Sequence, residues 1–329
     1  MAIGSKADFI IYSAQFWGGA IETLQQNADA FNSASLNVLR LVTRSILGDY
    51  EKESFLKSTS GLVSRRDVTT NNAVTSGKLS AGEFAGVKVN RRLGPVDQNR
   101  DSFRKIGVDP KEFSTMLGEQ AGVAIAVDYV NVALEAVNAA IINQGSALQY
   151  DGTGDTPATM DHTALVNAMS KFGDKSSRLL TFVMHSKPFF DLVKQSILDK
   201  IVNVADISVY NGTAATLGKP TVVIDSPVLV SLTAGSPLLT TYSTLCLTEN
   251  AIEIAESEER DILSQPQTGL ENLVDRIQGE YAFNVRVKGC AYDTTQGVNP
   301  TDTILATPAT WLKQVADNKE MPGTALKTK

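Results

Sequence analysis

The pattern of apolar and polar positions is most regular between Asp109 and Gly145, where it predicts one long α-helix. Asp109, Pro110 and Glu112 stand in the order of an N-cap, a proline at the first helical position and a reciprocal capping glutamate. Apolar positions then recur at steps of three and four, which predicts a single buried stripe. The stripe consists of Phe113, Leu117, Gln120, Ala124, Val127, Val130, Leu134, Val137 and Ile141.

Such a helix is long for a globular domain. At 1.5 Å per residue it would measure roughly 50 Å, whereas the average helix has about 11 or 12 residues. We therefore expect it to serve as a spine of the fold. A core helix of a large enzyme is the alternative explanation for the same pattern.

The regions before this helix are less regular. Residues 51–106 are rich in Ser, Thr, Asn, Gly and Arg, but Glu83–Val89 alternates as a strand does, so a long hairpin is expected. Within residues 1–48, apolar residues at helical spacing predict a helix. They are Leu36, Leu39, Val42 and Ile46.

The region after the long helix has an α/β-type pattern of short segments. Two helices are expected, at Asp161–Phe172 and Lys187–Asp199. Four strands are expected, at Leu179–Met184, Val222–Ile224, Thr240–Ile254 and Tyr281–Gly289.

Composition excludes several classes of protein. A chain of 329 residues with 43% hydrophobic content buries a sizeable core. No segment approaches 18 uninterrupted apolar residues, and the apolar run at Phe9–Tyr12 is too short for a signal peptide. Two cysteines, Cys246 and Cys290, do not make a disulfide framework. We expect synthesis in a reducing cytoplasm without export by a signal peptide.

Charge is distributed unevenly along the chain. The net charge is −6, yet residues 57–105 carry ten basic and four acidic residues, and residues 249–280 carry nine acidic and two basic ones. A basic stretch and an acidic stretch on the same chain favour head-to-tail contact between copies, in which the basic stretch of one meets the acidic stretch of the next. The candidate contact residues are Arg65, Arg66, Lys78, Arg91, Arg92, Glu253, Glu256, Glu258 and Glu259.

Two alternatives to this interpretation of the charges stay open. Each stretch can be an ordinary solvated face. Nucleic-acid binding by the basic stretch is the weaker alternative, because only Phe84 and Phe103 are available to stack on bases.

No catalytic or metal-binding pattern stands out. Gly212–Pro220 resembles a phosphate-binding loop, but its spacing has one residue too many and a proline replaces the Ser or Thr that holds Mg²⁺. His162 and His185 lack metal-ligand spacing, and Asp151 and Asp155 lack a full calcium loop. We expect no enzymatic activity and no cofactor. The alternative is a cytoplasmic α/β enzyme that uses residues 150–284.

Three segments carry a resemblance to a known family. They are Val183–Leu192 (VMHSKPFFDL), Leu217–Ser226 (LGKPTVVIDS) and Gln278–Gly289 (QGEYAFNVRVKG). In this order and spacing they resemble the major capsid proteins of tailed bacteriophages, whose fold is shared with encapsulin shells.

The resemblance implies an α+β fold with four parts. Residues 1–48 would be an amino-terminal arm, and residues 49–106 an extended β-hairpin loop that lies over an adjacent subunit. Residues 107–149 and 285–329 would form a peripheral domain around the spine helix. Residues 150–284 would form an axial domain around the five-fold and six-fold centres.

The resemblance also implies a function. Many copies would form pentamers and hexamers that close into an icosahedral shell around double-stranded DNA, assembled in the host bacterial cytoplasm. Separate scaffolding, portal and decoration proteins are the expected partners, with DNA contacted non-specifically and no membrane. Some relatives form a Lys–Asn crosslink between subunits, for which Lys78 is the candidate. The alternative within this fold is an encapsulin-type compartment with an enzyme cargo.

Overall fold

The computed structural model describes residues 13–34, 36–43, 48–57, 63, 65–66, 68–71, 73–74, 80–99, 110–201, 217–233, 239–269, 271 and 274–329. Its helices are α1 (Ser13–Ala34), α3 (Pro110–Ile142), α4 (His162–Ser170), α5 (Ser186–Ile201) and α6 (Asp302–Leu305). Its strands are β1 (Leu39–Thr43), β2 (Tyr50–Leu56), β3 (Ala81–Asn99), β4 (Gln149–Asp151), β5 (Leu179–Met184), β6 (Thr221–Val223), β7 (Val230–Thr233), β8 (Leu239–Thr248), β9 (Ile252–Gln267), β10 (Val274–Val287), β11 (Cys290–Tyr292), β12 (Trp311–Lys313) and β13 (Gly323–Thr328).

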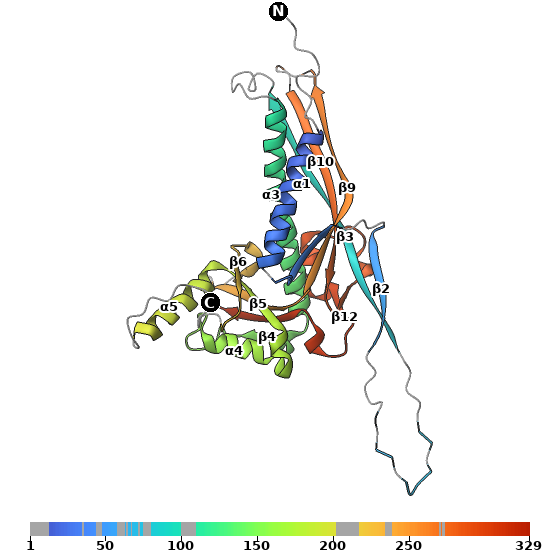
Figure 1. Cartoon of the computed structure of the whole chain (residues 1–329). Helices are drawn as coiled ribbons and strands as arrows, with labels where there is room; N and C mark the ends of the chain where they lie inside the picture. Colours follow the sequence, from blue (N-terminus) through green and yellow to red (C-terminus); the bar gives the residue numbers. More distant parts are fainter. Residues whose placement is uncertain are drawn as a thin grey trace, which may run out of the picture.

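The three longest strands, β3, β9 and β10, lie in one sheet, here called the long sheet, with the order β1-β9-β10-β3-β2. Strand β1 runs parallel to β9, and the other pairs are antiparallel. Helices α1 and α3 lie side by side along one face of this sheet (Figure 1). A small apolar core that includes Phe16, Ile262 and Ile277 joins the helices to the far half of the sheet.

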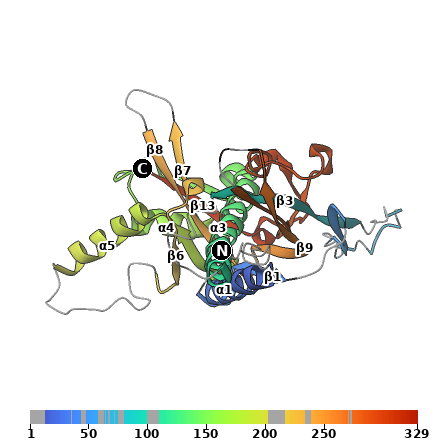
Figure 2. The ribbon, with the colours of Figure 1, turned by 90° about the horizontal axis from the view of Figure 1, so that it is seen from above.

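A second sheet, here called the mixed sheet, has the order β4-β13-β8-β5-β6, with β7 paired to β8. It contains both parallel and antiparallel pairs. Helix α5 projects from this part of the molecule, on the side opposite β2 (Figure 2). The β7–β8 hairpin also projects from it (Figure 2).

The two sheets divide the chain differently from the expected domain ranges. The expected axial region extends to residue 284, but residues 252–267 and 274–284 lie in β9 and β10 of the long sheet. The C-terminal strand β13 was grouped with the peripheral region, but it pairs with β4 and β8 of the mixed sheet. Local alternation predicts a strand, but it does not say which sheet the strand joins.

The long helix is α3, which begins at Pro110 and ends at Ile142, three residues before Gly145. The expected N-cap, Asp109, lies outside the described residues. Near the C-terminal end the predicted stripe is correct, because Leu134, Val137 and Ile141 are fully buried.

The middle of the predicted stripe is wrong, because Gln120, Ala124 and Val127 are exposed. Val127 is 55% exposed, whereas Ile125 and Tyr129 are buried. The segment Ser114–Ile142 is apolar on several sides, with a mean hydropathy of 1.5 in its most apolar window, so periodicity did not select the buried face. By length and composition alone this segment could cross a membrane, but 56% of that window is buried inside the molecule, which is typical of a core helix.

Glycines let α1 and α3 approach each other closely. A Cβ atom at Gly118 would lie 2.2 Å from the carbonyl oxygen of Phe16, and one at Gly122 would lie 2.8 Å from that of Ala20. Real Cβ atoms do not occur at such distances, so the contact requires glycine at both positions.

Two other predictions are corrected by the structure. The helix expected around Leu36–Ile46 is wrong, because Leu39–Thr43 is strand β1, whose backbone pairs with β9, and the helix α1 precedes it. The strand expected at Thr240–Ile254 is two strands in different sheets, separated by a turn at Asn250, whose φ is +51°. The expected hairpin is confirmed in the paired strands β2 and β3.

Candidate functional site

The hairpin formed by β2 and β3 projects from the body of the molecule (Figure 1). At its base, the backbone N–H of Lys57 donates to the carbonyl of Ser80 (2.8 Å), and the rings of Phe55 and Phe84 stack at 4.0 Å. Beyond this base, every described residue between 63 and 74 is exposed. The exposed residues include Arg65, Arg66 and three valines, Val63, Val68 and Val74. The tip therefore presents charged and apolar groups that its own chain does not bury.

Ion pairs fix the base of this hairpin to the long sheet. The guanidinium of Arg286 on β10 pairs with both Glu51 (3.4 Å) and Glu53 on β2. The amide of Asn284 donates to Glu51 Oε2 (2.7 Å). The direction in which the projection leaves the body is thus set by contacts within the subunit.

Arg91, a predicted contact residue, is instead held inside its own chain. Its Nε donates to Asp128 Oδ2 on α3 (3.1 Å), and its two terminal nitrogens donate to Asp302 on α6. The hydroxyl of Tyr281 on β10 donates to the same Asp128 oxygen (2.8 Å). Burial and the Asp128 carboxylate raise the pKa of Tyr281, so it stays a donor. The cluster ties β3, α3, β10 and α6 together.

Glu135 on α3 interacts electrostatically with Asp302, Arg91 and Asp128 of this cluster. Its Oε2 atom is buried and has no hydrogen-bond partner among the described residues. Burial, assisted by the nearby charges of Asp302 and Asp128, raises the pKa of Glu135 to about 7. The carboxyl group therefore changes its charge near neutral pH.

The other predicted contact residues are placed as follows. Arg92 is exposed on the long sheet, and Glu253 pairs with Arg40 on the neighbouring strand (3.7 Å). Glu256 is half-buried in β9, opposite Phe283 of β10. Glu258 and Glu259 are on β9, but their side chains lie outside the described residues, as does Lys78.

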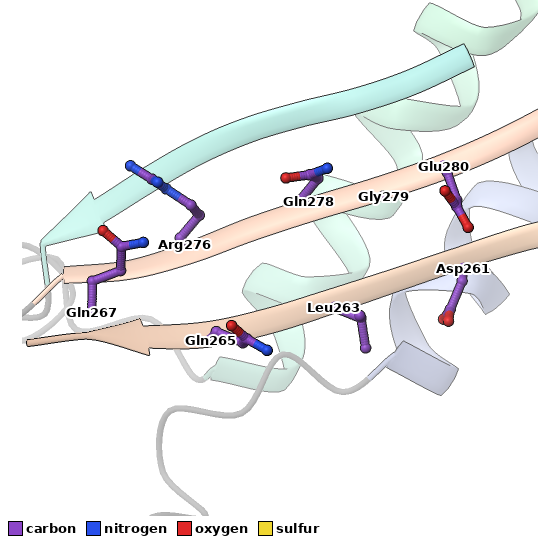
Figure 3. Close-up of a pocket in the computed structure, with 8 residues that line it drawn as sticks. All are labelled: Asp261, Leu263, Gln265, Gln267, Arg276, Gln278, Gly279 and Glu280. Carbon is purple, nitrogen blue, oxygen red and sulfur yellow. The ribbon is translucent and has the colours of Figure 1, made fainter. Parts of the chain in front are cut away.

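A shallow polar groove lies on the long sheet, on the face opposite α1 and α3 (Figure 3). Side chains of β9 and β10 line it over a volume of about 270 Å³. The lining residues are Asp261, Leu263, Gln265, Gln267, Arg276, Gln278, Gly279 and Glu280. Asp261 and Glu280 belong to the acidic stretch but were not singled out from sequence. The alternation around Ile262 and Ile277, which point to the helices, is the pattern that could have identified them.

An apolar groove lies on α3, beside β1 and the residue after β6. It is lined by Leu41, Val123, Ala126, Val127, Val130, Asn131 and Ile224. It contains the exposed part of the helix that the sequence predicted to be buried.

A serine, a histidine and an aspartate meet where β5 leads into α5. The Asp225 carboxylate accepts from the backbone N–H of Ser186 (3.0 Å), at the first residue of the helix. The His185 ring lies 3.4 Å from Ser186 Oγ and 3.5 Å from Asp225, longer than the hydrogen bonds of a catalytic triad. Hydrogen bonds from Ser186 hold the pKa of Asp225 below its ordinary value. The arrangement stabilises a helix N-terminus and brings two of the resemblance segments together, because β5 pairs with β6.

The remaining candidates from the sequence have structural roles. Asp151 Oδ1 accepts from the backbone and hydroxyl of Thr153, as in an Asx turn. Cys246 and Cys290 are free and buried, and burial raises the pKa of each thiol to about 12. Among the described residues, no group of His, Cys, Asp and Glu side chains is arranged to hold a metal ion.

Comparisons with known proteins identify a family and solved structures that are similar to this chain. Residues 8–325 match the family described as Gp13-like, major capsid protein 13-like. A structure from Microbacterium phage Oxtober96 is similar at 12% identity, with a TM-score of 0.53 and coverage of 89% of this chain and 90% of that one. The capsid of Ralstonia phage GP4 is similar at 10% identity, with a TM-score of 0.51 and coverage of 88% and 87%. A comparison with curated proteins gave no match.

These matches confirm the fold and the function expected from the resemblance, and they favour neither an enzyme nor another class. The structural likeness shows the fold, and the family match covers nearly the whole chain. The chain is therefore a capsid shell protein that associates with itself as a component of a virion, and it belongs to the Gp13-like family of major capsid proteins.

Proposed function

We propose that this chain forms pentamers and hexamers that close into an icosahedral shell around double-stranded DNA. The observation that carries the proposal is the β2–β3 hairpin, whose described tip residues are all exposed. In a closed shell such a projection would lie over an adjacent subunit and bury its valines there.

The two sheets suggest how the domains are assigned. The long sheet with α1 and α3 would form the peripheral domain, and the mixed sheet with α4 and α5 would form the axial domain around the symmetry centres. This assignment follows hydrogen bonding and not chain order. Assembly in the bacterial cytoplasm, and the use of separate scaffolding, portal and decoration proteins, are parts of the same proposal.

Electron microscopy and sedimentation of the protein expressed alone test this proposal. Closed shells, or rings of five and six subunits, are the expected result. A compact monomer that stays monomeric at high concentration, and also in the presence of its phage's other head proteins, would contradict it.

A further inference from the structure

The polar groove on the long sheet has an unbalanced row of charges. Asp261 on β9 lies directly opposite Glu280 on β10, and Glu280 lies opposite Arg92 on β3. Like charges at directly opposite positions destabilise a sheet. Among the described residues, Asp261 accepts a hydrogen bond only from the backbone N–H of Ile262, and no ion pair joins Asp261 or Glu280 to another of them.

The arginine that lines the groove, Arg276, does not relieve this repulsion. Arg276 is paired with Asp97 on β3 by two hydrogen bonds, of 2.6 and 2.7 Å. Leu263 lies between the Asp261–Glu280 pair and the Arg276–Asp97 pair, and its side chain is 61% exposed. The groove thus combines two adjacent carboxylates with one exposed aliphatic side chain (Figure 3).

The tip of the hairpin has the complementary chemistry. Arg65 and Arg66 are adjacent and exposed, and neither has an ion pair with a described residue. Val63 and Val68, on either side of them, are 95% and 81% exposed. Two cations flanked by aliphatic side chains match two carboxylates beside a leucine.

The groove and the tip of one subunit lie toward opposite ends of β3. Both positions are connected through β3, which spans 19 residues, or about 60 Å at 3.3 Å per residue. The β10 residues that line the groove pair with the far half of this strand, from Arg92 to Asp97, whereas the hairpin leaves from its other end, at Ala81. A contact between them therefore joins two different subunits.

We propose that Arg65 and Arg66 of one subunit bind Asp261 and Glu280 of an adjacent subunit, with a flanking valine packed on Leu263. The inference rests on the proposed shell and names the surface that receives the hairpin. The acidic partners are then Asp261 and Glu280, and not the glutamates of β9 that the charge count singled out.

Cysteine crosslinking in assembled shells tests the contact. Leu263→Cys is combined with Val63→Cys or with Val68→Cys, since both native cysteines are buried. After oxidation, we expect a ladder of covalent oligomers from at least one combination on a non-reducing denaturing gel. The control pairs the same loop cysteines with Val166→Cys on α4, which is 51% exposed, and should give no ladder.

Charge exchange supplies a second measurement. Asp261→Lys with Glu280→Lys should reduce shell yield at least tenfold, and addition of Arg65→Glu with Arg66→Glu should restore it. Normal shell formation by the lysine variant would overturn the inference, and so would cysteine variants that give no ladder beyond the control. Neither outcome would contradict the proposed shell function. Failure of the unmodified chain to form shells under any condition would instead overturn the proposed function, and this inference with it.

Discussion

At the scale of single residues, burial and neighbouring charge decide what each ionisable group does. Arg91 and Arg92 are adjacent in sequence, but Arg91 is held by Asp128 and Asp302 while Arg92 is exposed. A half-buried guanidinium with several charge-assisted hydrogen bonds contributes to folding. An exposed one is free for contacts between subunits.

Arg91→Ala should therefore destabilise the subunit itself. Loss of the guanidinium leaves Asp128 and Asp302 without their cation, and we expect a loss of about 1–3 kcal/mol in the free energy of unfolding. Thermal unfolding of unassembled subunits measures it. Arg92→Ala is the matched control and should lower the unfolding temperature much less, since this exposed arginine only faces Glu280 across the sheet; equal effects of both substitutions would contradict this account.

Glu135 should make stability depend on pH. The pKa of its carboxyl is about 7 in the folded chain against an ordinary value of 4.5, so the folded state binds the proton more tightly than the unfolded one. This contribution is fully present below about pH 4.5 and is lost as pH rises to about 7. Glu135→Gln should flatten the change of the unfolding temperature between pH 5 and pH 8 and raise that temperature at pH 8. A variant with the wild-type pH profile would show that another group is responsible.

At the scale of elements, the packing of α1 on α3 depends on close approach of the two backbones. Gly118 and Gly122 place the carbonyls of Phe16 and Ala20 against the helix surface. This geometry predicts that alanine at Gly118 lowers the stability of the subunit, whereas helix propensity alone predicts that it raises the stability.

Gly118→Ala should lower stability, because its Cβ would overlap the Phe16 carbonyl and force α1 away. We expect a loss of about 1–3 kcal/mol, whereas in an unobstructed helix the same change stabilises by roughly 1 kcal/mol. Chemical unfolding of unassembled subunits distinguishes the two. Gly18→Ala is the control, since nothing lies within 4 Å of a Cβ at that position of α1; a stabilised Gly118→Ala variant would rule out the close approach.

At the scale of the whole molecule, the subunit consists of a compact body and a projection that its own chain leaves exposed. The hairpin is anchored by Arg286 to Glu51 and Glu53, whereas its tip has exposed arginines and valines. Folding of the body and association of subunits should therefore respond separately to substitution.

Replacement of residues 58–79 by a two-residue Asn-Gly turn should leave the fold intact and prevent closure of shells. The β2–β3 pairing up to Lys57 and Ser80 stays in place, so the unfolding temperature should change by only a few degrees. Sedimentation and circular dichroism, measured on the same sample, separate assembly from folding. Normal shells from the shortened chain would show that the tip is dispensable.

Properties that depend on neighbours along the chain were determined by the sequence alone. The start of α3 at Pro110, the buried strand Leu179–Met184 and the β2–β3 hairpin follow from capping, periodicity and alternation, which act over a few residues. Three short segments in the correct order were also sufficient to indicate the capsid family.

Properties that depend on distant residues were decided only by the tertiary structure. Val127 was predicted to be buried and is exposed, since a helix that is apolar on several sides does not specify the face that its neighbours cover. Strands β9 and β13 joined sheets that chain order did not indicate, because pairing partners are chosen by packing across the whole molecule. Arg91 and Asp302 are more than two hundred residues apart, and only folding brings their charges into contact.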